Sequence, residues 1–250
     1  MMNLIRNGFE FLLISLFFLA ASASIAANAP ATTVMSSALP DPVGRVVWVN
    51  GSFTAIMPNK EKRLLQKTSL IYLHDTLITD ANTQAQIVFT DNSLITFRPN
   101  TNFYISQYSY NSQKKSGSVG KYIMNLVEGG FRTITGLIPK ANPSDYQVNT
   151  PVATIGVRGT DYVVYVHNGE LFVGYISGTP CVQDKKGVLC LDAKTPYAHV
   201  PRPDATPVPL QQQPAVFTQK LEIIPAVIAP FNQPTSGVTT GGTVSSFCIQ

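Results

Sequence analysis

An alternation of apolar and polar side chains with a period of two residues runs through the middle of this chain and constrains its fold most strongly. In residues 84–89 the apolar set Ala85, Ile87 and Phe89 takes every second position, and a turn at 91–93 precedes the next apolar run. Successive side chains of a strand point to opposite faces, so this spacing predicts a β-hairpin with one buried face. No segment shows a sustained helical apolar repeat with caps. The sequence therefore predicts an all-β fold.

A second hairpin is expected around Asn168-Gly169, between apolar runs at residues 160–166 and 171–176. An Asn-Gly pair suits a two-residue type I′ turn because both central residues need a positive φ. Both runs are apolar on both faces, so we expect this hairpin to lie in the centre of the sheet.

Six further runs follow the same pattern and bring the total to about ten short strands. They cover residues 43–49, 70–79, 103–108, 122–127, 131–135 and 146–148. Short strands separated by regular turns are typical of a single domain that is either a β-sandwich or a coiled β-roll.

The N-terminal 27 residues are expected to be an export signal. Arg6 supplies a positive charge, residues 11–21 form an apolar core, and small residues at 24–26 precede a cleavage point after Ala26 or Ala27. This core is shorter than the roughly 20 residues that span a bilayer, which favours a cleaved signal over an uncleaved anchor. The mature protein is then expected to be periplasmic or secreted, without an integral membrane span.

The mature chain is expected to have three parts. Residues 28–42 form a flexible lead-in rich in Ala, Ser, Thr and Pro, and residues 43–192 form the β domain. Residues 193–250 hold nine of the 18 prolines, which predicts a largely disordered tail. Within this tail, the apolar patch at 221–228 is a candidate for an added edge strand.

Charge and motifs exclude several functions. The 18 Lys and Arg residues exceed the 14 Asp and Glu residues by only four, and they are scattered, so no nucleic-acid partner is expected. The only histidines are His74, His167 and His199, and none lies in a catalytic or metal-binding motif. We expect no enzyme activity, no metal and no cofactor.

All three cysteines lie in the last third of the chain. Cys181 and Cys190 flank an Asp-Lys-Lys-Gly turn, so in an oxidising compartment we expect a disulfide between them across a hairpin. A free thiol, an intermolecular link and a bond to Cys190 all remain open for Cys248.

Two segments of the domain resemble the FecR domain, the extracytoplasmic part of the ferric-citrate regulator family. The first segment, at residues 74–105, includes Asp75 and the tripeptide Asp91-Asn92-Ser93. The second, at residues 150–162, runs from Thr-Pro to Val-Arg-Gly-Thr, and a Gly-Gly step lies between the two segments. The family-motif residues are Asp75, Asp91, Ser93, Gly129, Gly130, Thr150, Pro151, Val157, Arg158, Gly159 and Thr160. The resemblance covers about residues 43–178 and implies a domain that binds a partner.

The sequence departs from the family pattern at two positions: His74 stands where the family usually has Gly, and Asn92 replaces the Gly of Asp-Gly-Ser. Asn adopts a left-handed turn conformation more readily than most residues, so the second change is mild. Regulators of this family carry a cytoplasmic segment and a transmembrane helix before the domain, whereas only about ten residues precede the apolar run here. We therefore expect an exported domain without the part that binds a sigma factor.

Arg158 has two possible roles. Flanked by Gly156 and Gly159, it is either presented to an anionic group of a partner or paired internally with a carboxylate. We expect the internal pair, with Asp161, Glu128 or Asp75 as candidate carboxylates.

Two kinds of partner fit a noncatalytic domain. The first is an envelope protein, for which the domain would be an interaction module. The alternative is a glycan or another cell-surface polymer, favoured by the low charge and the ten tyrosines. A sugar site needs Trp48, or Tyr104, Tyr108 and Tyr110, in an open row, which distinguishes the two.

Overall fold

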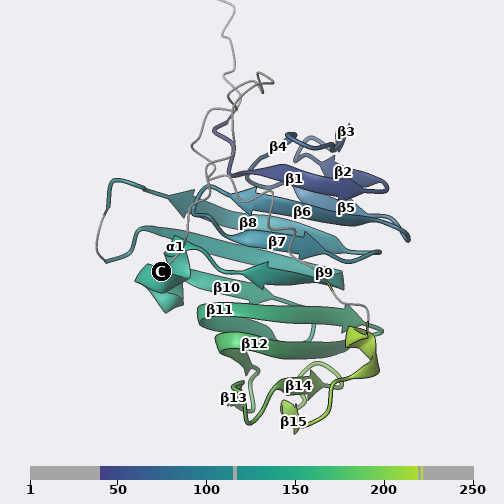
Figure 1. The fold of residues 1–250 in the computed structure, drawn as a ribbon, viewed down its shortest axis with the longest axis vertical. Coiled ribbons are helices and arrows are strands. Elements are labelled where there is room, and N and C mark those ends of the chain that lie inside the picture. Colours follow the sequence, from purple (N-terminus) through teal and green to yellow (C-terminus); the bar gives the residue numbers. More distant parts are fainter. Residues whose placement is uncertain (1–39, 115–116, 219–220, 222–250) are drawn as a thin grey trace, which may run out of the picture. The chain divides into compact units, whose positions relative to one another are not determined.

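The computed structural model describes residues 40–114, 117–218 and 221. The expected signal, most of the lead-in, Cys248 and the last 29 residues lie outside this range. The described part is all-β, as predicted, and its strands form one continuous 15-stranded sheet (Figure 1). Within the described residues, no helix is both long and apolar enough to cross a bilayer.

The strands before the centre of the domain are short, apart from β8. They are β1 (Gly44–Asn50), β2 (Phe53–Ile56), β3 (Lys62–Leu64), β4 (Leu70–Ile71), β5 (Thr76–Thr79), β6 (Gln84–Phe89), β7 (Leu94–Phe97) and β8 (Asn102–Tyr110). The later strands include three long ones: β9 (Gly120–Ile134), β10 (Tyr146–Asn149), β11 (Thr154–His167), β12 (Glu170–Gln183), β13 (Val188–Cys190), β14 (Tyr197–Val200) and β15 (Val208–Leu210). The helices are single turns: α1 (Leu137–Ala141), η1 (Pro143–Asp145) and η2 (Ala215–Phe217).

The three long strands fold the sheet into two layers. The first half of β9 pairs with β8 and β10, and its second half pairs with β7 and β11. Likewise, β11 pairs first with β10 and then with β9, and β12 pairs first with β14 and then with β13. Each of these three strands changes its pairing partners next to a glycine at positive φ, namely Gly129 in β9, Gly159 in β11 and Gly178 in β12. The runs at 122–127 and 131–135, which were expected to be two strands, are therefore one strand, and β11 and β12 extend through their bends beyond the predicted runs at 160–166 and 171–176.

We name the layers by their strands. The first layer holds β4, β1, β6, β7, the second halves of β9 and β11, the first half of β12, β14 and β15. The second layer holds β3, β2, β5, β8, the first halves of β9 and β11, β10, the second half of β12, and β13. Of the two predicted architectures, this arrangement is closer to a sandwich.

Aromatic side chains fill the space between the two layers. Phe103 on β8 packs edge-on against Phe97 on β7 at 5.1 Å and against Phe131 on β9 at 5.7 Å. Phe89 on β6 lies 4.7 Å from the ring of Tyr122 on the first half of β9. All five residues are at most 1% exposed, so burial of these rings holds the layers face to face.

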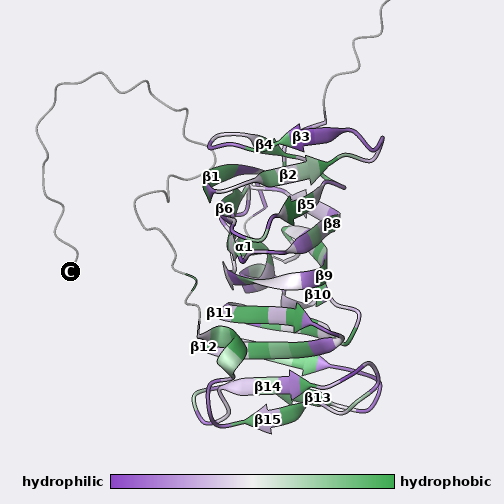
Figure 2. Cartoon of the chain, turned by 90° about the vertical axis from the view of Figure 1, so that its right-hand side faces the viewer, coloured by the Kyte–Doolittle hydropathy of each residue, from purple (hydrophilic) through white to green (hydrophobic). Residues whose placement is uncertain are grey.

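Both predicted hairpins are confirmed. β6 pairs with β7 across the turn at 91–93, and β11 pairs with β12 across Asn168-Gly169. Asn168 and Gly169 have φ values of 53° and 76°, as a type I′ turn requires. β11 and β12 have neighbours on both sides, and both ribbons are largely apolar (Figure 2).

The domain boundary predicted at residue 192 is wrong. β14 pairs with β12, β15 pairs with β14, and Phe217 packs with its ring 6.2 Å from that of Tyr197. Proline does not prevent this pairing because β15 is an edge strand, where Pro209 needs no second partner. The domain therefore includes residues 193–218, whereas most of the predicted edge strand at 221–228 lies outside the described residues.

Candidate functional site

Two family-motif residues, Asp91 and Ser93, lie where the β6–β7 turn contacts the start of α1. The backbone N–H of Ser93 donates to Asp91 Oδ1 at 3.0 Å, and the Ser93 hydroxyl donates to Asp91 Oδ2 at 2.9 Å. The backbone N–H of Gly136 donates to Ser93 Oγ at 2.9 Å, and that of Leu137 donates to the Asp91 carbonyl at 2.9 Å. These bonds tie two segments more than 40 residues apart, so this part of the motif builds shape.

Asp91 is fully buried among neutral donors. The hydroxyl of Tyr108 donates to Asp91 Oδ1 at 3.3 Å and accepts the Asp91 backbone N–H at 2.9 Å. Burial raises the pKa of the Asp91 carboxyl, and the hydrogen bonds from Ser93, Ile138 and Tyr108 oppose that rise only in part. Burial also raises the pKa of Tyr108.

Thr160 also joins two distant segments by hydrogen bonds, at the bend of β11. We call its pair of bonds with Thr135 the Thr135–Thr160 latch. The backbone N–H of Thr160 donates to Thr135 Oγ1 at 2.8 Å, and its carbonyl accepts the Thr135 backbone N–H at 2.9 Å. The bend of β11 is thereby fixed to the end of β9.

The remaining motif residues are spread over the domain. Asp75 binds Arg63 Nη2 at 2.5 Å and the Tyr72 backbone N–H at 2.9 Å. Thr150 Oγ1 accepts backbone N–H groups of the tight turn before β11, in which Pro151 is exposed. Val157 is buried in the core, and Gly129 and Gly130 form the bend of β9. The motif residues thus do not converge on one site.

The expected internal pairing of Arg158 is wrong. Each of the three candidate carboxylates has another cation or histidine as its partner: Asp161 binds Arg132, Glu128 binds His167 and Asp75 binds Arg63. Arg158 is exposed, and its side chain has no hydrogen bond or ion pair with any described residue. Its neighbour Gly159 has φ 57°, and the pairing register of β11 with β12 shifts between Arg158 and Asp161, so the strand is irregular at this point.

A mixed cationic and apolar surface surrounds this bend. Lys140 of α1 lies beside it, since its Cγ is 3.8 Å from where a Cβ on Gly159 would stand. Asp161 is in register with Ile134 of β9 on one side and Ser177 of β12 on the other. Leu137 opens α1, three residues after Ile134, and Ile176 directly precedes Ser177. Leu137 and Ile176 are 41% and 43% exposed. We call Leu137, Lys140, Arg158 and Ile176 the Arg158 patch.

Sequence reasoning singled out Arg158 and missed the other three members of this patch. Lys140 is one of many scattered lysines, and exposed Leu or Ile residues look like core residues in a sequence. Only the fold brings residues 137–140 beside the bend at 159.

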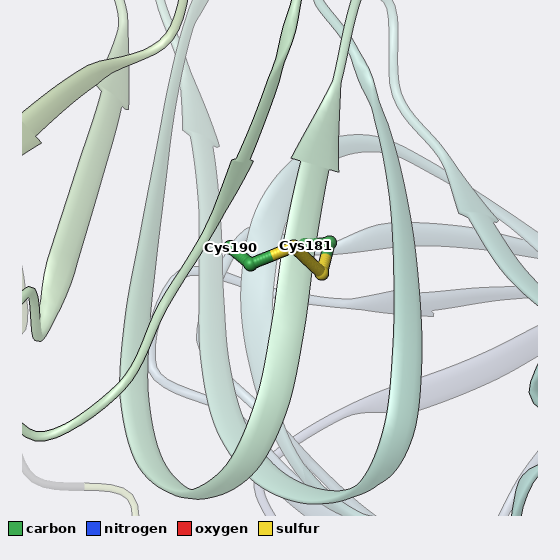
Figure 3. The surroundings of a disulfide bond; sticks show 2 residues. All are labelled: Cys181 and Cys190. Carbon is green, nitrogen blue, oxygen red and sulfur yellow. A yellow bond between two sulfur atoms is a disulfide. The ribbon is translucent and has the colours of Figure 1, made fainter.

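The predicted disulfide is present. Cys181 on β12 and Cys190 on β13 are directly opposite in register, and their sulfur atoms are 2.04 Å apart (Figure 3). The bond fastens the three-residue edge strand β13 to the second layer.

Replacing Cys181 and Cys190 together by Ser is expected to cost about 2.5–3 kcal/mol of unfolding free energy, because the unfolded chain gains the freedom of a loop of about ten residues. Urea denaturation of the oxidised protein and of the double variant measures this loss. Cys248→Ser is the control and should leave the midpoint unchanged. Equal midpoints for the double variant and the oxidised protein would contradict the prediction.

The histidines form two cross-strand pairs with carboxylates. His167 Nδ1 lies 2.9 Å from Glu128 Oε1, and His199 Nε2 lies 2.8 Å from Glu170 Oε2. Both pairs lie on open strand surfaces, without a Ser or Cys nucleophile bonded to either ring among the described residues. The described part of the chain also holds no cluster of three or more metal-ligating side chains.

One hollow of about 540 Å³ opens beside the start of β6 and the ends of β1, β7 and β11, and it is mainly polar. Its lining includes Asn50, Asn82, Asn100 and the pair Arg98–Tyr165. The Arg98 guanidinium stacks 4.8 Å above the Tyr165 ring, and burial lowers the pKa of Arg98. No carboxylate or histidine lines this hollow, so it lacks an acid–base pair.

The aromatic residues proposed for sugar binding do not form an open row. Tyr108 is 7% exposed, and Trp48, Tyr104 and Tyr110 are half-buried. Tyr104 is also bonded through its hydroxyl to His74 Nδ1 at 3.1 Å. This arrangement does not meet the criterion set for a glycan site.

These features define an all-β domain of two layers whose shared motif residues build bends and latches. Residues 75–179 match the model of the family described as FecR protein. That match confirms the resemblance to the FecR domain over these residues, which hold all the family-motif positions.

Two crystal structures of a proposed anti-sigma factor from Parabacteroides distasonis ATCC 8503 also align with the chain. Their sequence identities are 13% and 14%, and their TM-scores are 0.43 and 0.42. Each alignment covers 54% of this chain and 58% of the other, so the chain spans less than two thirds of those proteins. No curated protein matches the chain.

Proposed function

We propose that this protein is a noncatalytic protein-interaction module of the bacterial cell envelope, exported by its N-terminal signal, and that it binds an acidic surface of its partner through the Arg158 patch. The match to a regulatory family supports a binding role over catalysis. Its closest rival, glycan binding, lacks the open aromatic row that it requires.

The exposure of Arg158 is the observation that carries this proposal. A structural arginine at a strand bend would be paired, whereas this one extends from a backbone fixed by the Thr135–Thr160 latch. Lys140 adds a second positive charge beside it, and Leu137 and Ile176 add apolar area. Arginine next to exposed apolar side chains is a common composition at the centre of protein interfaces.

Arg158→Glu is expected to weaken partner binding at least about tenfold and to leave the melting temperature almost unchanged, because an exposed side chain without a partner contributes little to stability. The mature protein is used to capture its partner from envelope extracts, and the affinity of the purified pair is then measured at two salt concentrations. Lys140→Glu should show the same trend, and rising salt should weaken the wild-type complex.

Arg202→Glu is the matched control, since Arg202 is exposed and follows the end of β14, at the other end of the first half of β12. It should bind like the wild type. A partner that binds Arg158→Glu as tightly as the wild type would exclude the patch as the site. A fall in the melting temperature comparable to the loss of binding would restore a structural role for Arg158.

A further inference from the structure

Four apolar residues form a second cluster, separate from the main core. Val47 on β1, Val88 on β6 and Leu94 on β7 pack with Ile134 on β9. Their strand neighbours, among them Ile87, belong to the core between the layers. Since side chains alternate along a strand, this cluster lies on the outer face of the first layer.

The outer face of the first layer is buried at this cluster on β1, β6 and β7. Val47, Val88 and Leu94 are 4%, 2% and 3% exposed. Ile78 and Tyr104, which point outward from the second layer, are only half-buried. A bare outer face would leave the cluster as accessible as these two residues, so the cluster is covered. Among the described apolar residues, only Ile134 packs against it.

The described chain ends on this same face, against the strand that carries Ile134. Arg132 and Ile134 are two residues apart on β9 and therefore share a face. Arg132 donates from Nη1 to the carbonyl of Leu221 at 3.0 Å, and its Nε and Nη2 bind Asp161 at 3.0 and 2.7 Å. Leu221 is 5% exposed. The hydrogen bond from Arg132, whose guanidinium is fixed by Asp161, thus holds the backbone at Leu221 against β9.

We propose that residues 222–228 cover this cluster by crossing the outer face from β9 over β7 and β6 to β1. The segment reads Glu-Ile-Ile-Pro-Ala-Val-Ile, with a single charged residue next to the anchor. The crossing takes three interstrand steps of about 4.8 Å, or about 14 Å, and seven extended residues reach about 23–25 Å. Pro225 disfavours a ladder strand but is compatible with a segment that contacts only side chains.

This assignment makes the tail an intramolecular partner of the sheet. Loss of the segment would uncover a continuous apolar strip of four strands, and such strips bind other chains or aggregate. The inference does not depend on the Arg158 patch, whose residues lie in α1, β11 and β12.

Photo-crosslinking tests the assignment in the full mature chain. With p-benzoylphenylalanine in place of Leu94, irradiation should link β7 to the C-terminal tryptic peptide, residues 221–250, which contains no Lys or Arg. The same photoreactive residue in place of Tyr104, on the outer face of the second layer, is the control and should not capture that peptide. Capture of the peptide that ends at Arg45, of a second copy, or of no peptide from position 94 would overturn the proposal.

A second measurement avoids any change in the sheet. Ile224→Asp should expose the cluster and raise the fluorescence of the dye ANS several-fold, whereas Val238→Asp, in the Gly/Thr/Ser-rich end of the chain, should leave it at the wild-type level. Equal fluorescence for the two variants would refute the covering role of residues 222–228.

Discussion

Replacing Gly129 by Ala is expected to be among the most destabilising single substitutions in this domain. Gly129 has φ 81°, and a Cβ there would lie 2.5 Å from the carbonyl oxygen of Asn100 and 2.5 Å from the Cα of Thr101. Both neighbours are backbone atoms in the connection from β7 to β8, so neither can rotate away. The left-handed conformation costs about 1–2 kcal/mol for an alanine, and the overlap adds about 1–3 kcal/mol. The loss is therefore expected to be roughly 2–5 kcal/mol, a large share of the stability of a typical domain.

Gly156→Ala provides the control for this prediction. Gly156 also lies in a long strand, but nothing stands within 4 Å of its Cβ position. Its replacement should change the unfolding free energy by less than about 1 kcal/mol. Urea denaturation of both variants gives the comparison, and a Gly129→Ala protein as stable as Gly156→Ala would show that the bend of β9 does not need a glycine.

The turns and bends of the backbone explain why many of the family-motif residues are small or polar. His74 and Asn92, which replace the glycines of the family pattern, have φ values of 68° and 65°. The two departures therefore fall where the backbone is left-handed and where glycine is the least strained residue. The pattern records backbone conformations more than it records side-chain chemistry.

Local signals made much of the fold predictable. The alternation in residues 84–89, the Asn168-Gly169 turn and the spacing of Cys181 and Cys190 each depend on residues close in the sequence, and the structure confirms all three outcomes. The predicted count of about ten strands is too low, because the short strands β2, β3, β13, β14 and β15 have too few residues to show a clear alternation and the run at 70–79 contains both β4 and β5. The opposite error occurs at β9, where a glycine bend inside one strand resembles a break between two strands.

The errors came from contacts between distant segments. Arg132 and Arg158 are equally plausible partners for Asp161 in the sequence, but register places Asp161 beside the β9 residues at 132–134. The composition of the proline-rich segment after residue 192 predicts that it cannot fold alone. In the structure β14 is held by backbone pairing with the edge of β12, so it needs no core of its own. In both cases the deciding neighbour is tens of residues away.

Replacing Asp91 by Ala is expected to cost on the order of 3–5 kcal/mol, because it leaves several buried donors without an acceptor. The affected groups are the backbone N–H and hydroxyl of Ser93 and the Tyr108 hydroxyl, all of which are at most 7% exposed. Asn92→Gly, one residue away and exposed, is the control and should be neutral or slightly stabilising, because glycine adopts its φ of 65° without strain.

The same carboxyl predicts a pH dependence of definite sign. Because burial raises the pKa of Asp91, the folded protein binds this proton more tightly than the unfolded chain does. The stabilisation from the protonated form is then complete below the ordinary carboxyl pKa and is lost as pH rises through the raised value. Asp91→Asn cannot titrate, so the stability of the wild type relative to this variant should fall with increasing pH across that interval. Urea midpoints of both proteins over a series of acidic and neutral pH values measure the difference, and a relative stability that rises with pH would mean that the hydrogen bonds from Ser93, Ile138 and Tyr108 outweigh burial at this site.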